Sequence, residues 1–177
     1  MSGIEVVLFW ITVFTYVSAF SLQLFGSVRG RGGQVAVSSR LLLAGACVHA
    51  AVIAVRWVSG RHAPVAGTYE LNLTGTWLAL AVFLAFRYLK KADMLLGLVV
   101  VPIVFLALGH GFTLRDEAMP LGPAYDSPWL IVHVVFAWLA FGSFAVAAGA
   151  AGFLLIGKRI GRYWRLQAIP DPDRLDI

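Results

Sequence analysis

Long apolar stretches alternate with short polar connections along the whole chain. The apolar stretches cover about residues 4–25, 41–55, 69–86, 94–110 and 129–156. A helix needs about 20 apolar residues to cross a bilayer, so the pattern predicts an all-α, polytopic transmembrane bundle with five spans, of which the second and fourth are short. The first stretch lacks a cationic start and a small-residue cleavage site, and we expect it to be retained as a helix. Residues 1–177 should form one membrane domain, with 157–177 as its cytoplasmic tail.

The composition agrees with this pattern. Hydrophobic residues make up 60% of the chain and charged residues 13%, against roughly 25% charged residues in soluble domains. The mean hydropathy is +0.83. These values exclude an ordinary soluble domain.

The positive charges are distributed unequally between the two sets of connections. One set, which includes the C-terminal tail, holds eleven basic residues: Arg29, Arg31, Arg40, Arg87, Lys90, Lys91, Lys158, Arg159, Arg162, Arg165 and Arg174. The other set holds three: Arg56, Arg61 and Arg115. Because Lys and Arg accumulate in cytoplasmic loops, we expect the N-terminus outside and the C-terminus in the cytoplasm, as in a multi-pass protein of the bacterial inner (cytoplasmic) membrane. The net charge of +5 then needs no nucleic acid as a partner.

Local structure can be predicted for two of the connections and for the last helix. The stretch GSVRGRGGQVAVSSR, residues 26–40, is glycine-rich and basic and is typical of a flexible linker beside anionic lipid. The short stretch RYLKKAD, residues 87–93, predicts a tight turn between the third and fourth helices. The last helix contains small residues four apart, Ala145 with Gly149 and Ala148 with Gly152, which favour close helix packing within this chain or against a partner.

The candidates for chemistry are few. There is no His-Glu-x-x-His, Gly-x-Ser-x-Gly or phosphate-loop motif, so we assign no catalytic residue. Cys47 is the only cysteine, which excludes an intramolecular disulfide and a Cys-x-x-Cys redox pair.

Four histidines remain, and their depths differ. His49 should lie near the bilayer midplane, His62 in an outer connection, and His110 and His133 both near the outer surface, at about 1.5 Å per helical residue. A polar ring in an apolar helix needs a partner, and for His133 the residues leave two readings open. It is either a hydrogen-bonded structural residue, with Tyr125 or Asp126 as partners, or a ligand to haem or another metal. For the other three histidines the structural role is favoured.

Two segments resemble the cytochrome c assembly protein family of the CcsA, ResC and HemX types. RWVSGRHAPVAGTYELNLTGTW is similar to the family's Arg, Gly-x-x-Pro turn and Tyr-Glu pair, here with one extra residue before the proline; the matching positions are Arg56, Gly60, Pro64, Tyr69, Glu70 and Trp77. SPWLIVHVVFAW resembles its Trp-Leu-x-x-His helix, and the closing IPDPDRLDI resembles a cytoplasmic Leu-Pro-x-x-x-x-Leu-Asp stretch. The resemblance is to the N-terminal part of the family, so it implies either half of a split protein or a divergent member.

The resemblance also implies a site. His133 would be an external axial ligand to haem iron, with Trp129, Trp138, Tyr69 and Glu70 around the vestibule. The similar depth of His110 makes that residue a second candidate ligand. The cofactor would be haem b, bound transiently and shared with a membrane partner that carries the family's tryptophan-rich segment and second histidine. A ResB/CcsB-type subunit and apocytochrome c are the other implied partners.

The function implied is therefore that of a membrane subunit of haem-handling machinery for c-type cytochrome biogenesis. The chain would act within a haem-attachment (cytochrome c synthase) complex rather than as an enzyme by itself. The alternatives are a HemX-like regulatory or scaffold protein, and an accessory subunit of a respiratory complex, neither with haem chemistry of its own.

Overall fold

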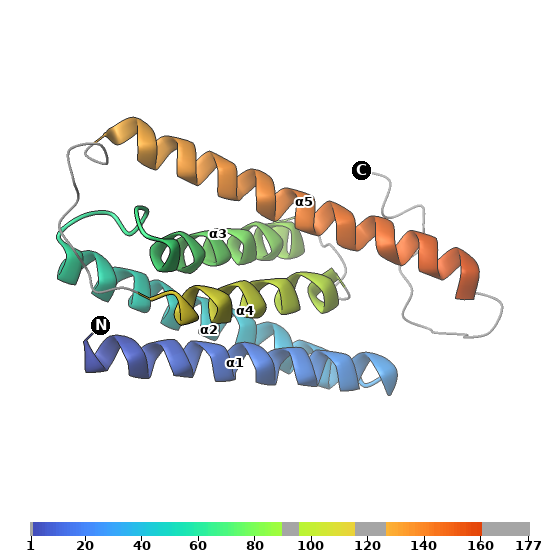
Figure 1. The fold of residues 1–177 in the computed structure, drawn as a ribbon. Helices are drawn as coiled ribbons and strands as arrows, with labels where there is room; N and C mark the ends of the chain where they lie inside the picture. Colours follow the sequence, from blue (N-terminus) through green and yellow to red (C-terminus); the bar gives the residue numbers. More distant parts are fainter. Residues whose placement is uncertain (1, 90–95, 116–126, 161–177) are drawn as a thin grey trace.

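Five α-helices make up the fold in a computed structural model that describes residues 2–89, 96–115 and 127–160 (Figure 1). In chain order they are α1 (Gly3–Val28), α2 (Gly32–Gly60), α3 (Thr68–Leu89), α4 (Gly97–Thr113) and α5 (Pro128–Ile160). Those residues contain no strand, so the predicted all-α class is confirmed. The predicted turn at 90–93, the partners Tyr125 and Asp126, and the tail beyond Ile160 lie outside the described residues.

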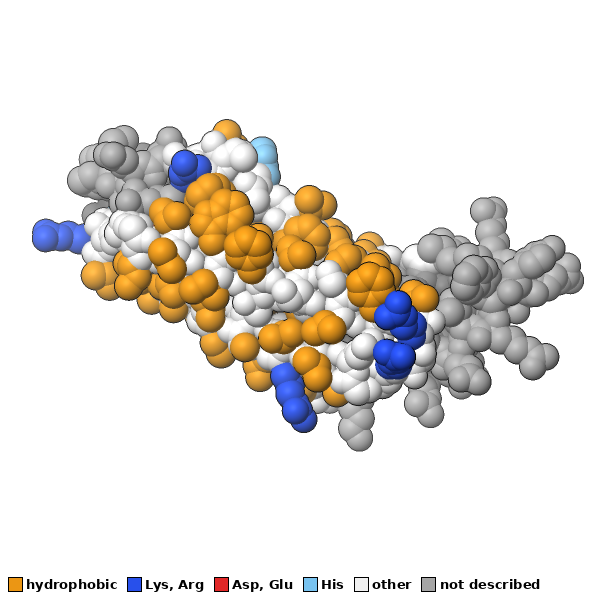
Figure 2. Space-filling view, turned by 90° about the horizontal axis from the view of Figure 1, so that it is seen from below, with side chains coloured by type: hydrophobic (Ala, Val, Ile, Leu, Met, Phe, Trp, Pro, Cys, Tyr) orange, Lys and Arg blue, Asp and Glu red, His pale blue; other side chains and the backbone are white. Residues whose placement is uncertain are grey.

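Four of these helices are long and apolar enough to cross a membrane, and α4, with 17 residues, is shorter. At 1.5 Å per residue α4 measures about 25 Å, close to the roughly 30 Å of a hydrocarbon core. Large hydrophobic side chains are exposed along α1 and α5, including Phe14, Phe136 and Phe144, and hydrophobic atoms cover much of the face in Figure 2. This surface is that of a membrane protein. The number of spans and the orientation stay predictions.

The first connection differs from the flexible linker predicted for residues 26–40. Only Arg29–Arg31 separate α1 from α2, and the turn closes through the Arg31 N–H, which donates to the Gly26 carbonyl at 2.9 Å. Gly30 takes a left-handed φ of +64°, a conformation that glycine adopts without strain. The prediction was wrong because α2 begins at Gly32 and residues 32–40 are helical.

Packing against neighbouring helices explains why this polar, glycine-rich stretch is helical. The Ser38 hydroxyl donates to the Ala19 carbonyl of α1 at 2.7 Å, and the Ser39 hydroxyl lies 3.1 Å from the Tyr88 hydroxyl of α3. Both serines are buried. Tertiary contacts of this kind override weak helix propensity.

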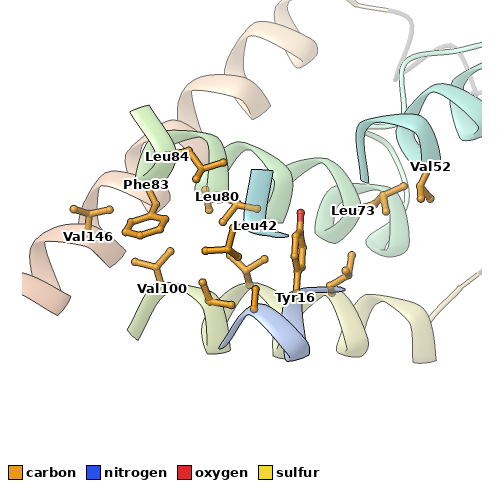
Figure 3. Close-up of a cluster of buried hydrophobic side chains, with 14 of the residues drawn as sticks. Tyr16, Leu42, Val52, Leu73, Leu80, Phe83, Leu84, Val100 and Val146 are labelled. Carbon is orange, nitrogen blue, oxygen red and sulfur yellow. The ribbon is translucent and has the colours of Figure 1, made fainter. Parts of the chain in front are cut away.

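The core lies between α1, α2, α3 and α4, with α3 at its centre. Half of the apolar window of α3 is buried, compared with 22% of that of α5. Figure 3 shows Tyr16, Leu42, Leu73, Leu80 and Val100 among the side chains that meet there. Helix α5 packs on α3 and α4 at one side of this core, and its last turns project beyond the other helices (Figure 1).

Close packing fixes α5 against its neighbours. Trp138 lies directly on Gly75 of α3, where a Cβ atom would overlap the indole ring. Ala145 and Gly149 are buried, and Gly149 faces Val99 of α4. One predicted small-residue pair therefore packs within the chain. In the other pair Ala148 is exposed and Gly152 has open space beside it.

Candidate functional site

A cluster of buried charged residues lies at the end of the bundle where α1, α3 and α5 begin and α2 and α4 end. It consists of Glu5 from α1, Arg56 from α2 and Glu70 from α3, whose side chains are 1%, 4% and 3% exposed. Arg56 Nε donates to Glu70 Oε1 at 2.9 Å, and Arg56 Nη1 lies 3.9 Å from Glu5 Oε1. We call these three residues the ion cluster.

Further contacts surround the ion cluster. The Ala66 N–H donates to Glu70 Oε2 at 3.3 Å, and the Arg56 guanidinium lies 5.3 Å from the centre of the Tyr69 ring. His62 Nδ1 lies 2.9 Å from the Ala63 carbonyl oxygen and 3.9 Å from Glu70 Oε2. One guanidinium thus pairs with two carboxylates that are buried away from water. These contacts join the ends of α1, α2 and α3.

The connection from α2 to α3 shapes this end of the bundle. Arg61 has a left-handed φ of 57° and its N–H donates to the Trp57 carbonyl at 2.9 Å, which ends α2. The Thr74 hydroxyl donates to the Pro64 carbonyl at 2.7 Å. Farther along α3, Trp77 Nε1 donates to the Ala46 carbonyl of α2 at 2.9 Å. The residues that carry the family resemblance in this segment therefore have structural contacts.

His49 is fully buried in the core. Its Nδ1 lies 3.1 Å from the Tyr16 hydroxyl. The Tyr16 ring packs so closely on Gly45 that a Cβ atom there would lie 2.7 Å from it. These contacts agree with the structural role expected for His49.

His133 lies on the face of α5 that points away from α3 and α4. Its side chain is exposed, as is that of Trp129 one turn earlier, which is 79% exposed. Neither ring nitrogen of His133 has a hydrogen-bond partner among the described residues. An accessible imidazole in an apolar helix has the donor chemistry that haem iron requires, but it can fill only one axial position.

The structure separates the predicted site residues into different environments. Glu70 belongs to the ion cluster, the Tyr69 ring lies beside Arg56, and Trp138 packs on Gly75. Of the four predicted vestibule residues, only Trp129 shares the outward face of His133. His110 is exposed near the end of α4.

Glu5 is the residue of this end that the sequence analysis missed. Its backbone N–H donates to the Ser2 hydroxyl oxygen at 3.2 Å, which caps the N-terminus of α1. A carboxylate in the first turn of a helix is also stabilised by the helix dipole. Glu5 is also the only acidic residue in the first apolar stretch. An ionisable residue in such a stretch usually has a partner in another helix, and that signal could have pointed to it.

Comparison with known proteins identifies relatives of one kind. The chain is 30% identical over 96 residues to the cytochrome c biogenesis protein CcsA of Trieres chinensis, a match of 52% of this chain and 30% of that protein. It is 28% identical over 127 residues to CcsA of Microcystis aeruginosa and 29% identical over 122 residues to CcsA of Gloeothece citriformis. These two matches cover 68% and 66% of this chain, and 38% and 36% of the relatives.

The matched part spans about a third of the length of these relatives. No family model and no solved structure matches the chain. The matches confirm the resemblance to CcsA-type cytochrome c biogenesis proteins over a partial region.

Proposed function

We propose that this protein is a membrane subunit of haem-handling machinery for c-type cytochrome biogenesis, in which His133 supplies one axial ligand to haem. The similarity to CcsA proteins supports a role in cytochrome c biogenesis. The observation that carries the proposal is the position of His133: an exposed ring on an apolar helix, with no partner among the described residues. Unsatisfied polar groups in a membrane are expensive and usually functional.

Each residue would have a limited and distinct task. His133 would present a neutral imidazole nitrogen, and Trp129, one turn away, would cover part of a flat aromatic ligand. The ion cluster would keep the ends of α1, α2 and α3 together, which holds the surface beside α5 in place. Bound haem b would supply the iron and the vinyl groups that become attached to a c-type cytochrome.

Partners would complete this site. A membrane partner with a tryptophan-rich segment would cover the haem and provide another ligand, in line with a transient, shared cofactor. A ResB/CcsB-type subunit and apocytochrome c are the other proposed partners. His110 remains a candidate for the second ligand, because it is exposed and histidine can ligate haem iron.

The second candidate function is that of a HemX-like scaffold that binds another membrane protein and no haem. The observation in its favour is that the outward face of α5, which carries His133, exposes large apolar side chains such as Phe136 and Phe144. Haem-free protein that is fully active in cytochrome maturation would favour this candidate.

Replacement of His133 by glycine tests whether His133 is a haem ligand. We expect haem content to fall in the purified membrane complex and added imidazole to restore part of it, because imidazole can occupy the vacated position. The measurement is the haem absorption spectrum at matched protein concentration.

Ala137→Gly is the matched control, since Ala137 is exposed on the same helix and its replacement has a similar helix cost of about 1 kcal/mol. This variant should keep its haem. If His133→Gly also keeps a wild-type spectrum, His133 is not a ligand and the scaffold function stands.

A second test concerns orientation, which decides whether His133 lies at the outer surface. The eleven-to-three distribution of basic residues predicts that the C-terminus lies inside. Alkaline phosphatase, which is active only outside the cytoplasm, should therefore be inactive when fused after Ile177, and a fluorescent protein that matures in the cytoplasm should fluoresce there. The opposite pair of results would contradict the proposed topology.

A further inference from the structure

Arg61, the residue that ends α2, has a backbone conformation that is unfavourable for an arginine. Its φ of 57° is the only left-handed φ of a non-glycine residue in the described part of the chain. Glycine usually occupies such a position at a helix end, because a Cβ atom is strained there. The proposed haem site does not involve Arg61. A strained residue at a turn therefore points to a task for its side chain.

The Arg61 side chain is exposed while its backbone is held in place. The Arg61 N–H donates to the Trp57 carbonyl at 2.9 Å, which closes the last turn of α2. Within residues 2–89, 96–115 and 127–160, the guanidinium of Arg61 takes part in no ion pair. A guanidinium has five N–H donors and no acceptor, so this exposed group is suited to bind an anion from outside the chain.

An exposed apolar surface leads along α2 to Arg61. Trp57 and Val58, in the last turn of the helix, are 54% and 79% exposed, and Val37 and Leu43 are exposed farther back. Trp57 lies three residues before the last residue of α2, which is about 4.5 Å along the helix axis. Tryptophan near the end of a spanning helix is typical of the level of lipid headgroups, and an arginine extends its charged end to the same level.

We propose that Arg61 binds the phosphate group of a membrane phospholipid, whose acyl chains lie against Trp57 and Val58. A phosphate diester is the anion that surrounds the end of a spanning helix in a bilayer, and the planar guanidinium can donate to two of its oxygens at once. This contact offsets the strain of the turn. The lipid site does not rest on the proposed haem site, because α2 packs on α1 and α3, whereas α5, which carries His133, packs on α3 and α4 (Figure 1).

Arg61→Gly tests the lipid site, because glycine suits the left-handed turn and only the side chain is lost. The full-length chain, purified in detergent, is equilibrated with phosphatidylethanolamine or with a diacylglycerol that has the same acyl chains and no phosphate. Native mass spectrometry then counts the bound lipid. We expect Arg61→Gly to bind severalfold less phosphatidylethanolamine at the tightest site and an unchanged amount of diacylglycerol. Ser59→Gly, at an exposed position in the same turn, is the matched control and should bind both lipids as the wild-type protein does.

The same variant should also unfold at a higher concentration of sodium dodecyl sulfate in lipid-free micelles, since glycine relieves the strain at this φ. A midpoint that does not rise would overturn the proposal, because the turn would then carry no strain that points to a task for the side chain.

Three binding results would also overturn it. The first is wild-type binding of phosphatidylethanolamine by Arg61→Gly. The second is displacement of the lipid by inorganic phosphate at equal concentration, which would show a site for a free anion. The third is a loss of haem from Arg61→Gly with unchanged lipid binding, which would assign Arg61 to the haem site. An unchanged haem spectrum in His133→Gly removes the haem role of that residue and leaves the lipid site standing.

Discussion

Replacement of Arg56 by methionine is expected to be the most damaging single change in the described part of the chain. It leaves the carboxylates of Glu5 and Glu70, both almost fully buried, without a guanidinium between them. Removing one partner of a buried ion pair destabilises a protein by about 3–5 kcal/mol, and here two like charges remain. We expect a large fall in the midpoint of unfolding by sodium dodecyl sulfate in mixed micelles, together with reduced membrane levels.

Arg115→Met is the matched control, because Arg115 undergoes the same chemical change at an exposed position. Its guanidinium lies 4.2 Å from the centre of the Phe112 ring and Nη1 donates to the Phe112 carbonyl, contacts worth little in water-exposed surroundings. The triple variant Glu5→Gln, Arg56→Met, Glu70→Gln should recover much of the stability, since no unpaired buried charge remains. Equal midpoints for Arg56→Met and Arg115→Met would show that the ion cluster contributes no stability.

The ion cluster and α5 are stabilised in different ways, and this difference bears on function. The cluster joins α1, α2 and α3 through charged groups, whereas α5 is held by the packing of Trp138, Ala145 and Gly149. Only a minor part of α5 is buried. A helix held on one face and free on the other is suited to bind a partner or cofactor, and His133 is on the free face.

The helices could be predicted from the sequence, because long apolar stretches bounded by charged residues leave few alternatives in a membrane. The start of α2 could not be predicted from the sequence. Gly32, Gly33 and the serines that follow favour a loop locally, and they become helical through hydrogen bonds to α1 and α3 that only the folded chain provides. Sequence patterns report local preferences, and these contacts are not local.

Prediction of the site was limited by the same cause. The Arg56 and Glu70 positions were identified by resemblance, but their pairing with Glu5 joins residues far apart in the chain. Tyr69 and Glu70 were expected around a haem vestibule, which stays a prediction; in the structure Glu70 pairs with Arg56, and the Tyr69 ring lies beside the Arg56 guanidinium. The direction in which a side chain points depends on where its helix starts and how that helix is rotated. For a helix that is apolar on every side, the pattern of the sequence predicts neither.

The second large effect is expected from Gly75→Ala, the smallest change that disturbs the contact between α3 and α5. An alanine Cβ at this position would overlap the Trp138 ring, so α5 must shift or Trp138 must change rotamer. Overpacking of this kind typically destabilises by about 1–3 kcal/mol, which exceeds the gain of about 1 kcal/mol that alanine brings to a helix. The detergent unfolding midpoint should therefore fall. Under the proposed role of His133 as a haem ligand, haem content should fall with it.

A matched control and a rescue make the cause of this loss testable. Gly109 is also a helical glycine, but a Cβ atom there would meet open space, so Gly109→Ala should leave the midpoint unchanged or raise it. In a double-mutant cycle, Gly75→Ala should cost much less when Trp138 is replaced by leucine, because neighbouring substitutions that share one contact are not additive. If Gly75→Ala is equally damaging with tryptophan and with leucine at position 138, its effect does not arise from this contact, and the packing of α5 on α3 must differ from the arrangement described.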